Sequence, residues 1–328
     1  MNAERIITVG PEDDGQRLDR WLKKCVPELP YGLAQKLIRK GAIKIDGRRG
    51  KTDSRLTAGQ QVRIPPIEDR PERQKKEKEF KEGDLEFIKS LVIYDDGDLV
   101  IFNKPAGLAS QGGGGVEHHI DAYFPLLAKN DMPPRLIHRL DRDTSGLLLT
   151  ARSPDAVRRL GKNFKDRRVR KIYWAATAGA PEDSEGTIKA PLAKADGPIK
   201  DRMIIDDAEG KYAETDFAVL DRLGTQAAFI AFWPRTGRTH QIRVHAADAL
   251  KCPILGDGKY GGGKAADLAE LDIAKGLHLH ARRLIFRHPV ENRMVDITAP
   301  LPEDMKKSWK ALGFDPSDKS NPFADIDL

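Results

Sequence analysis

The chain has 328 residues, with 56 Lys and Arg against 50 Asp and Glu and a formal net charge of +6. This length allows two domains, one of them with a sizeable core. No apolar run is long enough to span a membrane, no signal-peptide pattern opens the chain, and two cysteines provide no disulfide framework. We therefore expect a cytoplasmic protein without a membrane segment, and the sequence pI of about 9.1 points to a polyanionic partner.

A small module of helices and short strands is expected over residues 15–65. Leu18, Trp21 and Leu22 recur at helical spacing, and Gly41 is typical of a helix C-cap. The expected elements are helices over 16–22 and 32–40, a hairpin over 42–49 and a strand over 61–64. The basic residues expected on its surface are Lys36, Arg39, Lys40, Lys44, Arg48 and Arg49. Such a face could contact phosphates, or it could be a solvated face of an interaction domain.

Residues 66–86 are predicted to form a charged linker, because they alternate acidic and basic residues that cannot bury a core. A second domain is predicted over residues 87–314, followed by a polar C-terminal tail over 315–328. The strands expected in it cover residues 91–94, 99–102, 147–149, 171–177, 213–220, 226–233, 279–286 and 294–298. Because few helices separate these strands, the sequence predicts an α+β fold on a mixed, largely antiparallel sheet.

A polar loop between residues 136 and 150 interrupts two apolar segments of the second domain. Charged side chains between buried elements are costly unless they are paired or used. Asp141 and Asp143 are candidates for a nucleophile or a base, with Arg139 and Arg142 as neighbouring cations. A solvated loop whose charges pair with one another is the alternative.

Two other patterns could bind ligands. Residues 111–115 are glycine-rich and could bind phosphate, but no Lys-Ser/Thr pair follows them. The pattern therefore favours a flexible loop facing the substrate over a nucleotide-binding site. The histidine pairs His118-His119 and His278-x-His280 lack the cysteine or carboxylate partners of a zinc site. No metal is therefore expected.

The segment His138-Arg-Leu-Asp-Arg-Asp-Thr-Ser-Gly146 resembles the active-site loop of the RluA-type pseudouridine synthases. In that family the Asp after His-Arg-Leu is the catalytic nucleophile, which implies this role for Asp141. Tyr173 matches the family's Tyr-x-Ala motif, and the resemblance implies a ring stacked on the target uracil. A strand tyrosine with a buried ring is the alternative.

Residues 236–245 contain the family motif Gly-Arg-Thr-His-Gln-Ile-Arg-Val-His, which follows Thr236. The resemblance implies an ion pair between Arg243 and Asp141, in which the guanidinium would favour the ionised carboxylate. Arg243 on a solvated helix face is the alternative. Substrate or RNA contacts are expected from the motif residues His138, Arg139, Arg142, Arg238, His240 and Gln241, and from Lys104. Lys104, in a segment that resembles the first family motif, is either a support for the active-site loop or a solvent-exposed lysine.

The Arg-Leu-Asp opening at residues 17–19 and the Gly-Ala-Ile-Lys-Ile-Asp-Gly turn at residues 41–47 resemble the S4 RNA-binding domain. With this module and the His-Arg-Leu-Asp-Arg-Asp-Thr-Ser-Gly loop, the chain resembles enzymes that isomerise several uridines of 23S ribosomal RNA. This reaction needs no redox step, phosphate donor or metal, so no cofactor is expected, and a monomer is expected. A transfer-RNA target is the alternative within the family. Outside it, an inactive RNA-binding or ribosome-assembly protein and a carboxylate-based hydrolase using Asp143 remain open.

Overall fold

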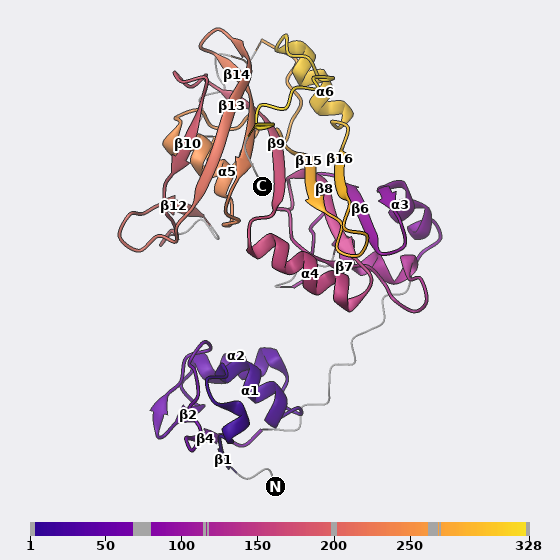
Figure 1. Cartoon of the computed structure of the whole chain (residues 1–328). Coiled ribbons are helices and arrows are strands. Elements are labelled where there is room, and N and C mark those ends of the chain that lie inside the picture. Colours follow the sequence, from indigo (N-terminus) through magenta and orange to yellow (C-terminus); the bar gives the residue numbers. More distant parts are fainter. Residues whose placement is uncertain are drawn as a thin grey trace. The chain divides into compact units, whose positions relative to one another are not determined.

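The computed structural model describes residues 4–67, 80–113, 116, 118–197, 202–261, 268 and 270–325. The chain divides into two compact units, Met1–Glu77 and Lys78–Leu328 (Figure 1). The boundary falls inside the expected linker over 66–86. Residues 68–79 of that linker, like Gly114 and Gly115 of the glycine-rich segment, lie outside the described residues.

The N-terminal unit packs two helices on a four-stranded sheet of order β1-β4-β2-β3. Its elements are β1 (Arg5–Thr8), a 3-10 turn (Pro11–Asp13), α1 (Leu18–Cys25), α2 (Tyr31–Arg39), β2 (Lys44–Ile45), β3 (Arg48–Arg49) and β4 (Gln61–Ile64). Trp21 and Ile38 bury the apolar stripes of the two helices against Val62 of the sheet. Strand β1 pairs with β4 upstream of Gly15, so the unit starts earlier in the chain than the sequence suggested.

The C-terminal unit is built on a ten-stranded sheet whose main path is β10-β13-β14-β9-β15-β8-β6-β5. Its strands are β5 (Val92–Asp95), β6 (Leu99–Lys104), β7 (Arg135–Leu136), β8 (Ser145–Ala151), β9 (Val169–Ala178), β10 (Glu185–Lys189), β13 (Glu214–Leu223), β14 (Ala227–Pro234), β15 (Leu279–Arg287) and β16 (Met294–Thr298). Only the pair β8–β15 is parallel among the pairings within the described part of this sheet. The prediction of an α+β fold with a mixed, largely antiparallel sheet is confirmed.

Helices and one small hairpin complete this unit (Figure 1). They are α3 (Asp84–Ser90), a 3-10 segment (Ile120–Leu127), α4 (Pro154–Lys165), the hairpin β11 (Leu192–Lys194) and β12 (Met203–Ile205), α5 (Gln241–Val244), a π-helical turn (His245–Ala249) and α6 (Glu303–Ala311). The side chain of Ser153 accepts a hydrogen bond from the Ala156 N–H and caps α4. Strands β10, β11 and β12 and helix α6 were not predicted.

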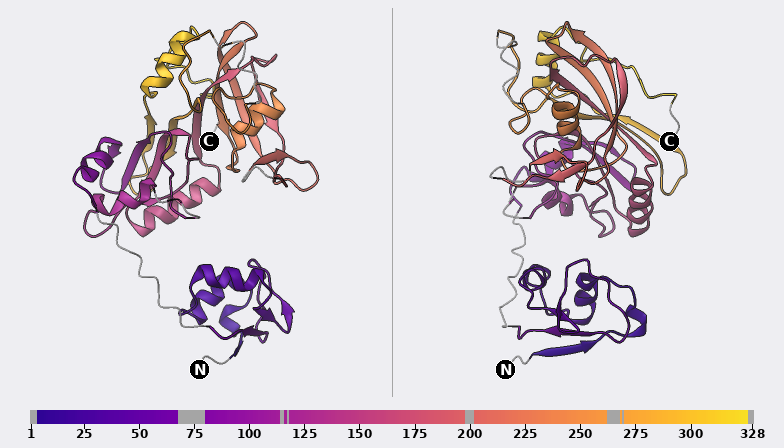
Figure 2. Two further views of the ribbon diagram at one scale, coloured as in Figure 1. Left: turned by 180° about the vertical axis from the view of Figure 1, so that it is seen from behind. Right: turned by 90° about the vertical axis from the view of Figure 1, so that its left-hand side faces the viewer.

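The two faces of the sheet are covered by different helices. Trp309 of α6 packs against Phe229 of β14, with ring centroids 5.4 Å apart, whereas Ile242 of α5 packs with Ile230, the next residue of that strand. Because successive side chains of a strand point to opposite faces, α6 and α5 lie on opposite sides of the sheet. Tyr173 of β9 packs into the cluster on the α5 side. The strands twist along the sheet, as two further views show (Figure 2).

Strand β15 lies between β8 and β9 and fixes their separation. Ala281 of β15 is the register partner of both Gly146 on β8 and Tyr173 on β9. Gly146 has a φ of +106°, and a Cβ there would lie 2.3 Å from the carbonyl oxygen of Ala281, so only glycine fits. The loop that precedes β8 is thereby held at the level of Tyr173.

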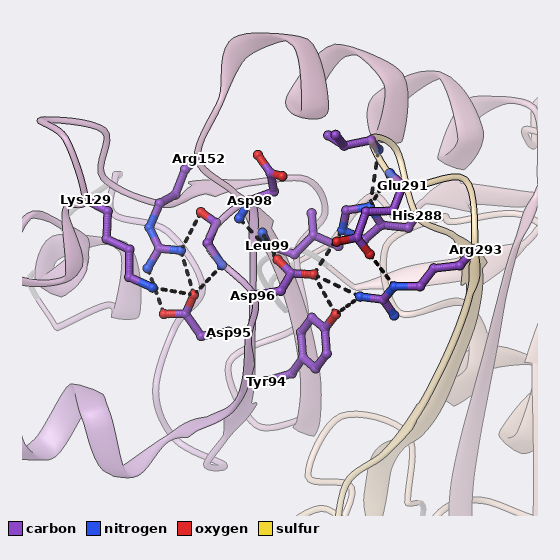
Figure 3. A network of polar contacts seen from close by, with 12 residues as sticks. Tyr94, Asp95, Asp96, Asp98, Leu99, Lys129, Arg152, His288, Glu291 and Arg293 are labelled. Carbon is purple, nitrogen blue, oxygen red and sulfur yellow. Dashed lines mark hydrogen bonds and ion pairs between the residues drawn. The ribbon is translucent and has the colours of Figure 1, made fainter.

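Acidic residues at the turn between β5 and β6 join three parts of the C-terminal unit (Figure 3). Arg152, which follows β8, donates to both carboxylate oxygens of Asp95 at 2.9 Å. Burial alone would raise the pKa of Asp95, but the hydrogen bonds from Arg152 and the Gly97 N–H lower it to about 2. Asp96 contacts the His288 ring at 3.0 Å, which ties this turn to the one between β15 and β16. The network stabilises the end of β8 away from the 137–144 loop.

The predicted polar tail over residues 315–328 includes a residue that belongs to the core. The ring of Phe323 is buried and lies 5.7 Å from that of Trp233, and its carbonyl accepts a hydrogen bond from Arg170 at 2.8 Å. The described part of the tail therefore contributes to the core as far as Phe323. The prediction of a polar tail failed because this one apolar side chain stands among polar residues.

Candidate active site

The three expected catalytic side chains line one open cavity of about 810 Å³ in the C-terminal unit. Asp141 comes from the loop between β7 and β8, Tyr173 from β9 and Arg243 from α5. Arg243 Nη1 lies 3.9 Å from Asp141 Oδ2, and the Asp141 side chain keeps 33% of its surface exposed. A carboxylate that is both near a cation and open to solvent can meet an incoming substrate.

The tightest partner of Arg243 is Asp257, which the sequence did not single out. Arg243 Nε and Nη2 donate to its two carboxylate oxygens at 2.7 and 2.6 Å, and the Asp257 side chain is fully buried. The backbone N–H groups of Lys259 and Tyr260 also donate to it. Burial alone would raise the pKa of Asp257, but the hydrogen bonds and charge of Arg243 lower it. The predicted Arg243–Asp141 pair is therefore the longer of two contacts, and Asp257 fixes the guanidinium.

His240 stands at the start of α5 in a left-handed conformation, with φ 54° and ψ 21°. Its Nε2 lies 3.9 Å from Asp141 Oδ2, and its Nδ1 lies 2.8 Å from the Tyr260 hydroxyl. The Met203 N–H donates to the same hydroxyl oxygen, which leaves the hydroxyl proton free for Nδ1. Burial lowers the pKa of His240, although the charge of Asp141 opposes the shift. A non-glycine residue at positive φ beside a reactive group is typical of functional sites.

Tyr173 serves both the core and the cavity. Its ring packs against two clusters of buried residues, and it also lines the cavity. Burial raises the pKa of the Tyr173 phenol, and the charge of Asp141 raises it further, so the hydroxyl stays protonated. The structure thus places the ring where it can face a base without excluding the packing role.

Lys104 is completely buried and supports the loop, which settles the alternative left open by the sequence. Its ammonium group donates to the carbonyl oxygens of Pro105, Leu108 and Arg142 at 2.9, 2.7 and 3.1 Å. Burial lowers the pKa of Lys104 to about 7, while Asp143 and Asp141 oppose the shift. Three acceptors match the three protons of the ammonium form. The expectation that Lys104 contacts RNA is wrong.

His138 was expected to hold the RNA backbone, and the structure gives it a different task. Its Nε2 accepts a hydrogen bond from the Leu149 N–H at 3.0 Å, and its ring stacks on Phe164 at 4.9 Å. Burial, with a smaller effect of the Lys171 charge, lowers the pKa of His138 to about 3. A neutral ring used as an acceptor cannot form an ion pair with phosphate, so His138 anchors the loop to β8.

Gln241 is likewise occupied within the fold and is only 4% exposed. Its Oε1 accepts from the Thr236 hydroxyl and the Arg238 N–H, at 2.7 and 3.0 Å. Its Nε2 donates to the Glu214 carbonyl and the Thr215 hydroxyl, at 2.9 and 2.8 Å. The expected RNA contact is therefore wrong, because this side chain has no free donor and holds the 236–241 segment against β13.

The remaining arginines of the motifs lie at the mouth of the cavity. Arg139, Arg142 and Arg238 are exposed and line it. Arg142 and Arg238 each donate one hydrogen bond to a backbone carbonyl, those of Gly107 and Tyr212. Within the described part of the chain, none of the three has a carboxylate within ion-pair distance. Their guanidinium groups can therefore reach an anionic ligand.

The paired histidines of the sequence have hydrogen-bond partners in the core. His278 contacts the Ser308 hydroxyl at 2.8 Å, and His280 contacts the Ser145 hydroxyl at 2.8 Å. No group of three or more potential metal ligands occurs among the described residues. In the same part of the chain, no helix combines the length and apolar character required to cross a membrane.

Comparison with known proteins agrees with this geometry. Residues 98–248, which contain the three catalytic candidates, match the family model described as RNA pseudouridylate synthase. The ribosomal large subunit pseudouridine synthase C of Escherichia coli (strain K12) is 32% identical over 314 residues, which cover 94% of this chain and 96% of that protein. The enzyme of the same name from Rickettsia bellii (strain RML369-C) is 33% identical over 301 residues, 90% of this chain and 98% of that one.

Solved structures show the same relationship. Human RNA pseudouridylate synthase domain containing 4 has a TM-score of 0.58 and 29% identity, covering 70% of this chain and 97% of that chain. Human RNA pseudouridylate synthase domain containing 1 has a TM-score of 0.52 and 27% identity, covering 64% and 83%. The chain therefore belongs to the RluA-type pseudouridine synthases and is an isomerase that acts on RNA.

Proposed function

We propose that this enzyme converts uridines of 23S ribosomal RNA to pseudouridine, with Asp141 as the nucleophile. The observation that carries this proposal is the convergence of Asp141, Tyr173 and Arg243 on one cavity, with the carboxylate 3.9 Å from the guanidinium and still accessible. The ribosomal target is supported by relatives that are named as large-subunit enzymes and that match nearly the full chain.

The chemistry assigns one task to each side chain. Asp141 attacks the uridine and forms a covalent bond to it, the N-glycosidic bond breaks, and the uracil turns and rejoins the sugar through C5. The bond to Asp141 then breaks and regenerates the carboxylate, while C5 loses its proton and N1 gains one. Arg243, held by Asp257, stabilises the ionised carboxylate before attack. Tyr173 stacks on the uracil and keeps it in the cavity while it is detached. No cofactor or metal takes part.

The target uridine must leave its base stack before Asp141 can reach it, so single-stranded or bulged RNA is the favoured substrate. The exposed Arg139, Arg142 and Arg238 at the mouth of the cavity can contact the backbone around the extruded nucleotide. The N-terminal unit acts as an S4-like RNA-binding module of a monomeric, cytoplasmic enzyme. Its cations Lys36, Arg39, Lys40, Arg48 and Arg49 are exposed and Lys44 is half-buried, and none has a carboxylate partner among the described residues.

The other functions have less support. Asp143 is exposed and does not line the cavity, so it is poorly placed to be the second carboxylate of a hydrolase. An inactive scaffold would not need the buried Arg243–Asp257 pair behind Asp141. A transfer-RNA target is the remaining candidate, because the cavity accepts a single extruded nucleotide whatever its source.

Asp141→Asn tests the nucleophile, because the amide keeps the shape of the side chain but cannot attack. The matched control is Asp143→Asn, two residues away in the same loop. Tritium release from ribosomal RNA carrying 5-tritiated uridine should stop in the first variant and continue in the second. Release by Asp141→Asn at the wild-type rate would refute the role.

The RNA class needs a test in cells. Pseudouridine positions in ribosomal and transfer RNA can be mapped in cells that have the protein, lack it or carry Asp141→Asn. Loss of modifications confined to 23S ribosomal RNA supports the proposal. Loss confined to transfer RNA would replace the target while leaving the chemistry intact.

A further inference from the structure

The cavity contains a cation that the proposed chemistry does not use. Lys171 lies on β9 two residues before Tyr173, so both side chains point to the same face of the sheet, and both line the cavity. The Lys171 side chain is half-buried, with its ammonium group 5.7 Å from the centre of the Phe164 ring. Within the described residues, no carboxylate lies within ion-pair distance of it.

The neighbours of Lys171 do not compensate its charge. The His138 ring stacks on the Phe164 ring, which Lys171 also contacts. The Nε2 of His138 already accepts a hydrogen bond from the Leu149 N–H, so it is not an acceptor for Lys171. The Phe164 ring provides only a weak cation–π contact at this distance. Burial lowers the pKa of Lys171 to about 8, with no opposing acidic group. An unpaired ammonium in a partly desolvated place is costly for the free protein, which suggests that its counter-ion arrives with a ligand.

Lys171 is also not an ion-pair partner of the reacting carboxylate. Within the described residues, the cations within ion-pair distance of Asp141 are Arg243 and, when protonated, His240. The surrounding wall of the cavity is basic, because Lys165 and Arg167 at the end of α4 line it too. This side of the cavity therefore suits an anion that does not react.

We propose that Lys171 binds a non-bridging phosphate oxygen of the RNA backbone next to the extruded uridine. The inference rests on the proposed function, in which the uracil of that nucleotide lies against Tyr173. Two residues along a strand are about 6.6 Å apart, so one strand can hold the base with Tyr173 and the backbone of the same nucleotide with Lys171. Lys171 is then a binding residue for the known reaction, and it positions the nucleotide without reading its base.

The test combines a protein variant with a change in the RNA, using the full chain and a short RNA that contains a target uridine. Lys171→Met removes the charge and keeps the apolar stem, and Lys162→Met, an exposed position of α4 outside the cavity, is the control. A methylphosphonate replaces the phosphate on the 5′ or the 3′ side of the uridine and removes its charge. Half-saturating RNA concentration and single-turnover rate at saturation are measured for each combination.

We expect Lys171→Met to raise the half-saturating RNA concentration by about ten- to a hundredfold, the effect of a charge-assisted hydrogen bond, and to leave the saturating rate within a few-fold of wild type. One of the two methylphosphonates should weaken RNA binding by the wild-type protein by the same factor as Lys171→Met does. The same methylphosphonate should not weaken binding by Lys171→Met any further. Lys171→Arg should retain most of the affinity, and Lys162→Met should behave as wild type. Thermal unfolding of Lys171→Met should occur at or above the wild-type temperature, because an unpaired, half-buried charge has been removed.

The proposal is overturned if, for both methylphosphonates, the loss of affinity multiplies with the loss caused by Lys171→Met. It is also overturned if Lys171→Met binds RNA as the wild type does, or if neither methylphosphonate weakens binding by the wild-type protein. A collapse of the saturating rate with unchanged binding would also overturn it, since Lys171 would then act on the reaction. If Lys171→Met unfolds at a markedly lower temperature than the wild type, Lys171→Gln replaces it in the same set of binding and rate measurements. Absence of tritium release by the wild-type protein would refute the proposed function instead, and the binding measurements would still report on the phosphate contact.

Discussion

The role of Asp257 can be separated from general stability by exchanging it for asparagine. Asp257→Asn removes the charge that holds Arg243 by two hydrogen bonds of 2.7 and 2.6 Å, and both side chains are nearly or fully buried. Breaking a buried pair costs about 3–5 kcal/mol, and Asn retains one acceptor, so we expect about 3 kcal/mol. For a unit of this size that corresponds to a fall of about 6–12 °C in the unfolding temperature.

The larger effect should be on catalysis. Without Asp257, Arg243 is free to turn toward Asp141, only 3.9 Å away, and to form a direct pair that hinders attack. Misplacement of a group by about 1 Å can cost roughly a hundredfold in rate, so we expect a single-turnover rate about a hundredfold below wild type at saturating RNA. Rates are measured well below the unfolding temperature of the variant.

Asp95→Asn is the matched control. Asp95 also accepts two hydrogen bonds from one buried arginine, Arg152, but at the end of β8 away from the active-site loop (Figure 3). Because Asp95 is 26% exposed, its loss should cost less, about 2 kcal/mol, and the folded variant should keep the wild-type rate. Equal rates for Asp257→Asn and Asp95→Asn would refute the positioning role of Asp257.

Three further outcomes are expected. Lys104→Met leaves three carbonyl oxygens without their ammonium partner and should cost about 3 kcal/mol in unfolding free energy, measured by denaturant titration; a loss below 1 kcal/mol would contradict its support of the loop. Tyr173→Phe should retain most uridine binding, and Tyr173→Ala should lose about 1–3 kcal/mol of it in RNA titrations; undiminished turnover in both would leave Tyr173 a core residue only. Deletion of residues 1–77 should reduce the slope of log affinity against log salt by about 0.7–0.9 per lost phosphate contact, while single-turnover chemistry on a short RNA persists. An unchanged slope would mean that the N-terminal unit does not hold RNA.

The sequence predicted the long central strands and the meeting of the motifs, because both depend on local patterns, but it missed β1, β10, β11 and β12. Continuous apolar runs over residues 217–220 and 227–233 identify β13 and β14. The motifs around Asp141 and Arg243 are specific enough to predict a shared cavity. Asp257 was missed because it stands in a Leu-Gly-Asp-Gly turn with no periodicity, and its partner is fourteen residues earlier in the chain.

Motif membership was a poorer guide to what each polar side chain contacts. Lys104, His138 and Gln241 were all expected to contact RNA, yet the polar atoms of each form hydrogen bonds within the protein. Burial depends on the tertiary packing of distant segments, which a local string does not contain. Phe323 shows the reverse case, an apolar residue in a polar stretch that inserts into the core.

The position of β15 also determines when the enzyme can become active during its synthesis. The strands that carry the loop of Asp141 and the ring of Tyr173 do not pair with each other, because residues 279–287 pair with both and lie between them. Contacts between segments so far apart in the chain form late and slowly. A nascent chain can therefore have exposed every catalytic motif outside the ribosome and still lack the cavity until this strand has emerged and inserted beside Gly146.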